Sequence, residues 1–471
     1  ASDSHAEQVA LAASEPVRWT VDPRRARATS RTSLRRGDVV WFVLRYAADK
    51  PLAVEHYGSD RKLQATRRFW REWTASIEYE GPYRQQVERS ALALKLLFYA
   101  PTGAVIAAPT TSLPEEIGGM RNWDYRFTWL RDAAFTLHAL QTIGHYDEAG
   151  RFANYLVGIA QRSSGRLQIM YGVGGERSLP ERVLDHLEGY AGSRPVRIGN
   201  AAHRQIQLDV YGEVIESIHA WYLKHGRLTE SVWLLVRRMA DRVVKIWKQK
   251  DYGIWEVRAD IQHYVFSKVM CWLALDRAVR IAERTGHPGD VERWRAEAEQ
   301  IRAQILARGW SEERQSFVQH YDTLALDAAN LLIPLVGFLP ADDPRVRATV
   351  HATIDGLTTE DREMVYRYRN PDGLPGDEGV FSICTFWLAM ALIGSGEVQA
   401  GRQIFQKMLG HANAVGLYSE ELDPRTGEFL GNFPQALTHI ALIHTAKMLE
   451  VAERRGKAAV RREPPIGGTD S

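Results

Sequence analysis

The chain has 471 residues, of which 45% are hydrophobic and 25% charged, proportions that exclude wholesale disorder. Lys and Arg total 60 against 58 Asp and Glu, so the net charge is only +2. This balance argues against a dedicated nucleic-acid binder, whose basic excess would be visible. The length accommodates one large domain or two to three medium ones.

Neither a membrane span nor a secretion signal is predicted. No run of 18 apolar residues occurs, and the N-terminus lacks a basic region followed by an apolar stretch, so we expect a cytoplasmic protein. Cys271 and Cys384 lie in apolar, helix-like runs, which predicts buried and reduced thiols. The 15 histidines form no zinc-binding pattern, so we expect neither a metal nor another cofactor.

Residues 1–80 differ from the rest of the chain. Their first half is polar and rich in arginine, and we interpret it as a solvated edge because no aromatic residues alternate with the arginines. Residues 39–44 predict a β-strand, entered through the turn-like Gly37 and Asp38. A single strand does not fold alone, so this segment is interpreted as the remnant of a β-sandwich or as a linker.

From residue 84 to 456 the apolar residues recur with a helical period. Residues 457–471 are expected to form a flexible tail. Short glycine-containing breaks, such as Gly226 and Gly286, separate the helices in pairs. The predicted helical segments are 84–99, 128–142, 146–162, 206–225, 228–248, 262–285, 289–308, 325–335, 343–356, 379–395, 397–410 and 434–455.

Six helical hairpins with short connections at one end and long connections at the other predict a mainly α fold, an (α/α)6 barrel with a short β-containing N-terminal segment. An open α-solenoid is the alternative, but the sequence shows no fixed-period repeat. In a closed ring the long connections would gather on one face and build a pocket there.

Three of these long connections carry unusual sequences. Glu256 follows Trp255 between apolar residues; a carboxyl group against an indole has a raised pKa and can donate a proton, although a surface pair with Arg258 is the alternative. Glu420 and Glu421 stand in an acidic stretch, where one ionised carboxylate could activate water, or where both could simply be solvated.

The third stretch, Arg121 to Asp132, lies just before and within the start of the helix predicted at 128–142, and it alternates aromatic side chains with Arg and Asp. Tyr125 and Trp129 offer ring faces, and Arg and Asp can each form two hydrogen bonds to neighbouring hydroxyls, as in a sugar site. A salt-bridged helix start is the alternative. The Gly-rich run 171–177 lacks a following Gly-Lys-Ser/Thr and is a poor phosphate loop.

Five motifs in this order resemble glycoside hydrolase family 15, which contains glucoamylases, glucodextranases and bacterial trehalases. The resemblance runs from about residue 85 to 455, and two further stretches, 170–179 and 193–200, look most like its actinobacterial trehalase branch. Its motifs are Arg121–Asp132, Gly253–Glu256, Asp372–Gly379, Ser419–Glu421 and Gly431–Ala436.

The resemblance implies an inverting, exo-acting α-glucoside hydrolase. Glu256 matches the general acid and Glu420 the general base of the family. Inversion requires these two carboxyl groups to stand about 6.5–9.5 Å apart, with water between them. The residues that match substrate-binding positions are Tyr125, Trp129, Arg131, Asp132, Trp255 and, more weakly, Arg367 and Glu421.

The expected partner is therefore a small α-glucoside rather than a nucleic acid or a membrane, and a homo-oligomer is left open. Trehalose stands first among the substrates, and maltose-type or isomaltose-type glucans stand second. Two other functions are alternatives to hydrolysis. A disaccharide phosphorylase would not need a base such as Glu420, and a catalytically idle glucan-binding protein would lack one of the two carboxylates, which are both present.

Overall fold

The computed structural model describes residues 9–25, 27–46, 52–162 and 167–456. The chain divides into two compact units, Ala1–Ser76 and Ile77–Ser471. The predicted tail, residues 457–471, lies outside the described residues. In the described residues no helix has both the length and the apolar character needed to cross a membrane.

The smaller unit contains two antiparallel strand pairs and one long helix. Strand β1 (Val9–Ala13) pairs with β4 (Phe42–Tyr46), and β2 (Thr20–Asp22) pairs with β3 (Arg27–Thr29). The predicted strand at 39–44 therefore begins three residues later. Helix α1 (Ser59–Ala75), none of whose residues is buried, is not predicted from the sequence. Short 3-10 turns, η1 (Pro23–Arg25) and η2 (Val54–Tyr57), complete the unit.

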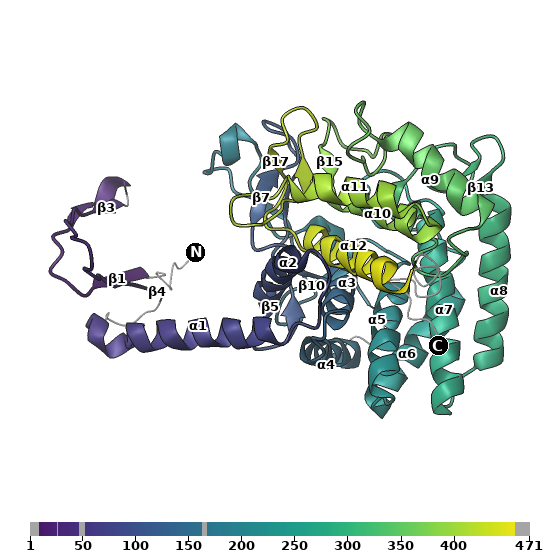
Figure 1. Ribbon diagram of the computed structural model, residues 1–471, viewed down its shortest axis with the longest axis horizontal. Helices are drawn as coiled ribbons and strands as arrows, with labels where there is room; N and C mark the ends of the chain where they lie inside the picture. Colours follow the sequence, from purple (N-terminus) through teal and green to yellow (C-terminus); the bar gives the residue numbers. More distant parts are fainter. Residues whose placement is uncertain (1–8, 26, 47–51, 163–166, 457–471) are drawn as a thin grey trace. The chain divides into compact units, whose positions relative to one another are not determined.

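The larger unit is an (α/α)6 barrel. Its inner helical elements contact one another in a closed ring, in which the last contacts the first, and α12 lies beside α10 in Figure 1. In ring order these elements are α3 (Leu130–Gln141), α5 (Val210–His225), α7 (Val265–Thr285), η5 (Ala328–Leu332), α10 (Ser382–Ser395) and α12 (Ala436–Arg455).

The outer helices each pack against one or two inner elements. All residues of α3 and α10 are buried, whereas the outer helices alternate buried and exposed residues. A helix that is buried on all sides lies inside a protein, so α3 and α10 belong to the inner layer. The helices with an exposed face belong to the outer layer. The outer helices are α2 (Arg84–Leu96), α4 (Asp147–Arg162), α6 (Glu230–Ile246), α8 (Val291–Arg308), α9 (Pro344–Leu357) and α11 (Val398–Leu409).

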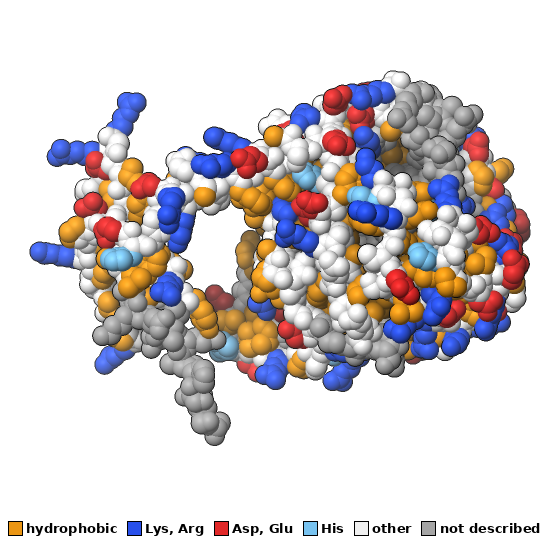
Figure 2. Space-filling view, turned by 90° about the horizontal axis from the view of Figure 1, so that it is seen from below, with side chains coloured by type: hydrophobic (Ala, Val, Ile, Leu, Met, Phe, Trp, Pro, Cys, Tyr) orange, Lys and Arg blue, Asp and Glu red, His pale blue; other side chains and the backbone are white. Residues whose placement is uncertain are grey.

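Eleven of the twelve helical segments predicted for the barrel are α-helices. The segment expected at 325–335 is instead the 3-10 helix η5, because Pro334 lacks the N–H that a continuing helix would need. Gly226 and Gly286 end their helices in left-handed conformation, as predicted from their positions in the sequence. On the face shown in Figure 2, the barrel surface interleaves basic and acidic side chains, in line with the near-zero net charge.

The long connections contain short antiparallel strands, which fix the loops that carry the polar motifs. The strands are β5 (Phe98–Tyr99), β6 (Ala104–Val105), β7 (Thr111–Pro114), β8 (Asn122–Asp124), β9 (Thr128–Trp129), β10 (Met170–Tyr171), β11 (Arg182–Val183), β12 (Arg197–Ile198), β13 (Trp310–Ser311), β14 (Ser316–Phe317), β15 (Val380–Phe381), β16 (Glu421–Leu422) and β17 (Phe429–Leu430). The same connections contain two short 3-10 helices, η3 (Tyr190–Gly192) and η4 (Ala201–Arg204).

Candidate active site

A small hollow at the ends of the inner helices gathers residues from four separate connections. Five of the residues singled out in the sequence line it: Tyr125, Trp129, Trp255, Glu256 and Arg367. The hollow has a volume of about 40 Å³, which holds water but not a sugar ring.

The first wall is the segment that leads into α3. Trp129 pairs with Met170 through strands β9 and β10, and it is the residue that precedes the helix. Its ring lies edge-on to Tyr125, with 5.4 Å between the ring centres. Arg131 and Asp132 consequently occupy the first helical turn, where the helix dipole favours a carboxylate.

Arg131 connects this wall to the second one. Its Nε and Nη2 atoms each lie 2.9 Å from Asp132 Oδ2, and its Nη1 donates to Glu256 Oε1 at 3.0 Å and to the carbonyl of Ile254. Asp132 Oδ1 and Trp129 Nε1 are buried without a hydrogen-bond partner among the described residues. Buried polar atoms are rarely left unpaired, so both atoms are suited to bind a hydroxyl group that enters the hollow.

Glu256 is held in an unusual backbone conformation at the end of a tight turn. Its φ is +52°, in the left-handed region that few residues other than glycine adopt. Gln207 Nε2 donates to its Oε1 at 2.8 Å, and Gln205 Nε2 donates to its carbonyl at 3.3 Å. The neighbouring Trp255 is fixed by a hydrogen bond from its Nε1 to Asp327 Oδ1 at 2.9 Å. Strained backbone held in place by several contacts is typical of functional sites.

Glu420 comes from the α11–α12 connection, just before the hairpin β16–β17. Tyr125 Oη donates to Glu420 Oε1 at 2.6 Å, and the Asn432 N–H lies 3.4 Å from Oε2. The side chain is 1% exposed, and this burial raises the pKa of Glu420 to about 7, although Tyr125, Arg367 and the Asn432 N–H act in the opposite direction. The sequence left open that Glu420 is simply solvated, and its burial excludes this alternative.

Tyr125 links the two carboxyl groups that the sequence singled out. It lines the same hollow as Glu256, and its hydroxyl group is bonded to Glu420. Glu256 is also tied to Arg131, and so to Asp132. Tyr125 therefore connects Glu420 to the wall of the hollow that Glu256 lines.

Arg367 and Glu421 complete the predicted set, and only Arg367 reaches the hollow. Its guanidinium lies 5.8 Å from the centre of the Trp255 ring and pairs with Glu378. Glu421 instead accepts a hydrogen bond from the Gly379 N–H at 2.8 Å, because consecutive residues of a strand point to opposite faces.

Glu421 belongs to a buried carboxylate cluster with Glu115 and Glu378, whose oxygen atoms lie within 4.8 Å of one another. Burial raises the pKa values of Glu115 and Glu421 well above the ordinary range. Arg121 and Arg367 both lie within 3.8 Å of Glu378, so positive charge already stands beside this cluster.

Several residues around the hollow gave no signal in the sequence. Gln205 and Gln207 hold Glu256, but isolated glutamines in a loop fit no motif. Glu115 lines the hollow directly after strand β7, and Asp327 orients Trp255 from the start of η5. Gly431 belongs to the Gly431–Ala436 motif, but its close approach to Glu420 depends on the folded hairpin.

The (α/α)6 barrel and the hollow define a glycoside hydrolase, because Glu256 and aromatic side chains line the hollow and hydrogen bonds join Glu420 to Tyr125 and Arg131 to Glu256. The sequence model of Glycosyl hydrolases family 15 matches residues 81–447, and the chain belongs to this family.

The chain is similar to curated relatives along most of its length. It is 44% identical to a trehalase from Mycolicibacterium smegmatis over 93% of this chain and 67% of that protein. It is 42% identical to a trehalase from Thermoplasma volcanium over 88% of this chain and 66% of that protein. Among solved structures, a bacterial glucoamylase complexed with acarbose matches 81% of this chain and 56% of its own, with a TM-score of 0.63 and 18% identity.

Proposed function

We propose that this protein hydrolyses α,α-trehalose to two glucose molecules, with inversion at the carbon that water attacks. The observation that carries the proposal is the link through Tyr125, which lines the hollow with Glu256 and donates to Glu420. An inverting hydrolase needs one carboxyl group that gives a proton and one that takes a proton, on either side of a single sugar.

In the proposed reaction Glu256 donates its proton to the oxygen that joins the two glucose units. Glu420 removes a proton from a water molecule, whose oxygen forms a bond to the anomeric carbon as the glycosidic bond breaks. The products contain the atoms of trehalose plus one water. Arg131 and Asp132 would hold the hydroxyl groups of the terminal glucose, and Asp132 Oδ1 has no other partner among the described residues.

The choice of trehalose rests on the two relatives called trehalase, whose identity to this chain exceeds 40% over most of its length. Maltose-type and isomaltose-type glucans are the second candidates, because the residues around the first sugar would serve any terminal α-glucose. The residues that contact the second sugar would decide between trehalose and these glucans. There Trp123 lies between Arg197 and Arg258, at 4.7 and 4.8 Å from the ring centre.

The test is to follow the first glucose formed from trehalose by proton NMR, in parallel with maltose, isomaltose and soluble starch. Inversion predicts one α-glucose and one β-glucose from each trehalose, because only the attacked half changes configuration. Two α-glucose products would contradict inversion, and faster glucose release from maltose or isomaltose would contradict the substrate. Formation of glucose 1-phosphate in added phosphate would indicate a phosphorylase instead.

A further inference from the structure

Arg258 lies two residues after Glu256 and lines the same hollow. The sequence left open a surface pair between Arg258 and Glu256, but Glu256 pairs with Arg131 instead. The guanidinium of Arg258 lies 4.8 Å from the centre of the Trp123 ring and 3.7 Å from Glu181 Oε2. A cation therefore stands at the hollow without a part in the two proposed proton transfers.

The exposure of the side chains shows which end of the hollow faces solvent. Asp132 and Arg131 are 1% and 9% exposed, whereas Glu256 is 20% and Arg258 is 26% exposed. Arg131 and Asp132 are the proposed anchors of the terminal glucose, so this sugar would lie toward the closed end. The second glucose is joined to it through the oxygen that Glu256 would protonate, and would then lie on the side of Arg258.

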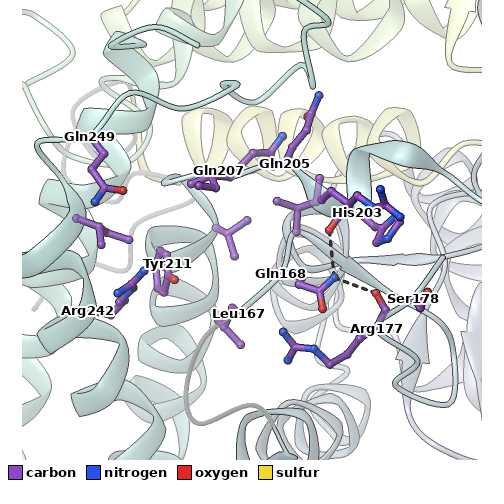
Figure 3. A pocket seen from close by; sticks show the side chains of 15 residues that line it. Leu167, Gln168, Arg177, Ser178, His203, Gln205, Gln207, Tyr211, Arg242 and Gln249 are labelled. Carbon is purple, nitrogen blue, oxygen red and sulfur yellow. Dashed lines mark hydrogen bonds between the residues drawn. The ribbon is translucent and has the colours of Figure 1, made fainter. Parts of the chain in front are cut away.

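Two larger spaces border the residues around Glu256, and they differ in whether they adjoin the hollow. A cavity of about 470 Å³ lies beside Gln207 (Figure 3), but neither Glu256 nor Arg258 lines it. A groove of about 1250 Å³ adjoins the hollow, since Glu115 and Asp372 line both. The backbone N–H of Arg258 donates to the Asp372 carbonyl at 3.0 Å, so Arg258 stands at this junction. The groove, unlike the cavity, thus offers room for a second glucose next to Arg258.

Arg258 is held in a way that leaves its N–H groups available. Glu181 balances its charge from 3.7 Å, a distance longer than a hydrogen bond, and the Trp123 ring supports the guanidinium through a cation–π contact. Gln205 Nε2 donates to the carbonyl of the preceding Val257 at 3.2 Å. A guanidinium presents five N–H donors in one plane, which suits neighbouring hydroxyl groups of a sugar.

We propose that Arg258 binds hydroxyl groups of the second glucose, and that Glu181 is a positioning residue that holds the Arg258 guanidinium at the solvent-facing end of the hollow. Arg258 then favours a sugar as the leaving group and contributes to the choice of substrate. This role rests on the proposed function, because a second glucose is present only when the substrate is a disaccharide.

The test compares two substrates that share the terminal glucose. Trehalose carries a second glucose, whereas α-glucosyl fluoride carries in its place a fluorine atom, which leaves as fluoride. For Arg258→Gln we expect kcat/KM on trehalose to fall at least about tenfold, because charge-assisted hydrogen bonds to the sugar are lost. On α-glucosyl fluoride kcat/KM should stay within about twofold of the unsubstituted protein. Arg258→Lys keeps the charge but not the planar set of donors, and should show a smaller loss on trehalose alone.

Glu181→Gln should show the same selective loss on trehalose at about threefold, as expected for a solvent-accessible ion pair. Arg182→Gln is the matched control. Arg182 is the exposed neighbour of Glu181 on β11 and does not line the hollow, so neither substrate should be affected.

Equal losses on both substrates in Arg258→Gln would mean that Arg258 only supports the fold around Glu256, and would overturn its role in binding. Unchanged kcat/KM on trehalose, or an equal loss in Arg182→Gln, would overturn it as well. Equal losses on both substrates in Glu181→Gln would overturn the positioning role of Glu181.

Failure of the proposed function would look different, because the unsubstituted protein would then release fluoride from α-glucosyl fluoride but no glucose from trehalose. The comparison would in that case use the disaccharide that the protein does cleave. A loss in Arg258→Gln that is not selective for that disaccharide would overturn the role of Arg258 independently of the substrate.

Discussion

Glu256 and Glu420 are held by different contacts. Glu256 is bound by Arg131 and Gln207 and is only partly buried. Glu420 is almost wholly buried and is bonded to the Tyr125 hydroxyl group. A hydrogen bond donated to a carboxylate favours its charged form, which is the form that takes a proton from water.

Replacing either carboxyl group should remove most of the turnover. For Glu256→Gln and for Glu420→Gln we expect kcat on trehalose to fall at least about a hundredfold, because an amide neither donates nor accepts a proton in this reaction. Glucose release at saturating substrate is the measurement. The matched controls are Asp260→Asn and Glu428→Gln, which are exposed residues of the same two connections. Near-normal turnover of either active-site variant would refute the role assigned to that residue.

Glu420 should also set the acidic limb of the pH–rate profile. The base acts only when ionised, so with its pKa raised to about 7 the rate should fall as the pH drops through about 7. Tyr125→Phe removes the hydroxyl group whose hydrogen bond lowers the pKa of Glu420, so this limb should move to higher pH.

The check on this shift is kcat/KM measured from pH 5 to pH 9. Tyr190→Phe, at an exposed position, is the control and should leave the limb in place. An unchanged limb in Tyr125→Phe would mean that Glu420 is not the group that titrates there.

At the level of elements, the hairpin β16–β17 determines where Glu420 lies. Gly431, directly after β17, has a φ of +72° and donates its N–H to the Pro114 carbonyl at 2.7 Å. A Cβ atom built at this position would stand 2.5 Å from Glu420 Oε2. Only glycine lets the returning backbone pass so close to the proposed base.

Gly431→Ala should therefore displace the Glu420 side chain and lower kcat by more than about tenfold, since small misplacements of catalytic groups are costly. Gly427→Ala is the matched control. It has the same φ of +72° in the same hairpin, but its added Cβ would meet only His411, at 3.5 Å. Both variants carry the same backbone strain, so equal rate losses would rule out the contact with Glu420 as the cause.

At the level of the whole molecule, the ring is closed where α12 meets α3. There His138 Nδ1 and His444 Nε2 lie 3.1 Å apart, and both rings are buried. Burial lowers the pKa of His138 to about 4 and that of His444 well below its usual range. Both histidines are consequently neutral in the folded protein at pH values where an unfolded chain would already bind protons.

This pair should make the barrel sensitive to acid. Between about pH 6.5 and pH 4 the unfolded chain binds a proton at residue 138 that the folded protein does not, so the free energy of unfolding falls as the pH is lowered. The contribution of His138 is at most about 3 kcal/mol. His138→Gln should lose this part of the pH dependence, so its stability relative to the unsubstituted protein should improve as the pH falls.

Urea unfolding at pH 7 and pH 4.5 measures the change. The buried carboxyl groups, whose raised pKa values act in the opposite direction, are common to both proteins and cancel in the difference. His351→Gln, at an exposed position on α9, should follow the unsubstituted protein at both pH values. A constant difference between His138→Gln and the unsubstituted protein would exclude His138 as an acid-sensitive group.

Much of the barrel could be predicted because helical periodicity and glycine stops are local properties. The segments predicted at 146–162 and 262–285 are helices at 147–162 and 265–285. Helix α1 is not predicted, and η5 is shorter than the helix predicted at 325–335 because Pro334 interrupts it. The proposed catalytic pair could be named because each carboxyl group stands in a recognisable motif.

The sequence by itself determined the helical period of the apolar residues, the alternation of short and long connections, and the residue types that a sugar hydrolase needs. Only the tertiary structure decided which groups touch: Tyr125 contacts Glu420, Gln207 contacts Glu256, and Glu421 lies in a carboxylate cluster with two other glutamates. The physical reason is range. Periodicity and chain stops act over a few residues, whereas burial, charge pairing and close approach are set by segments that meet only when the ring has closed.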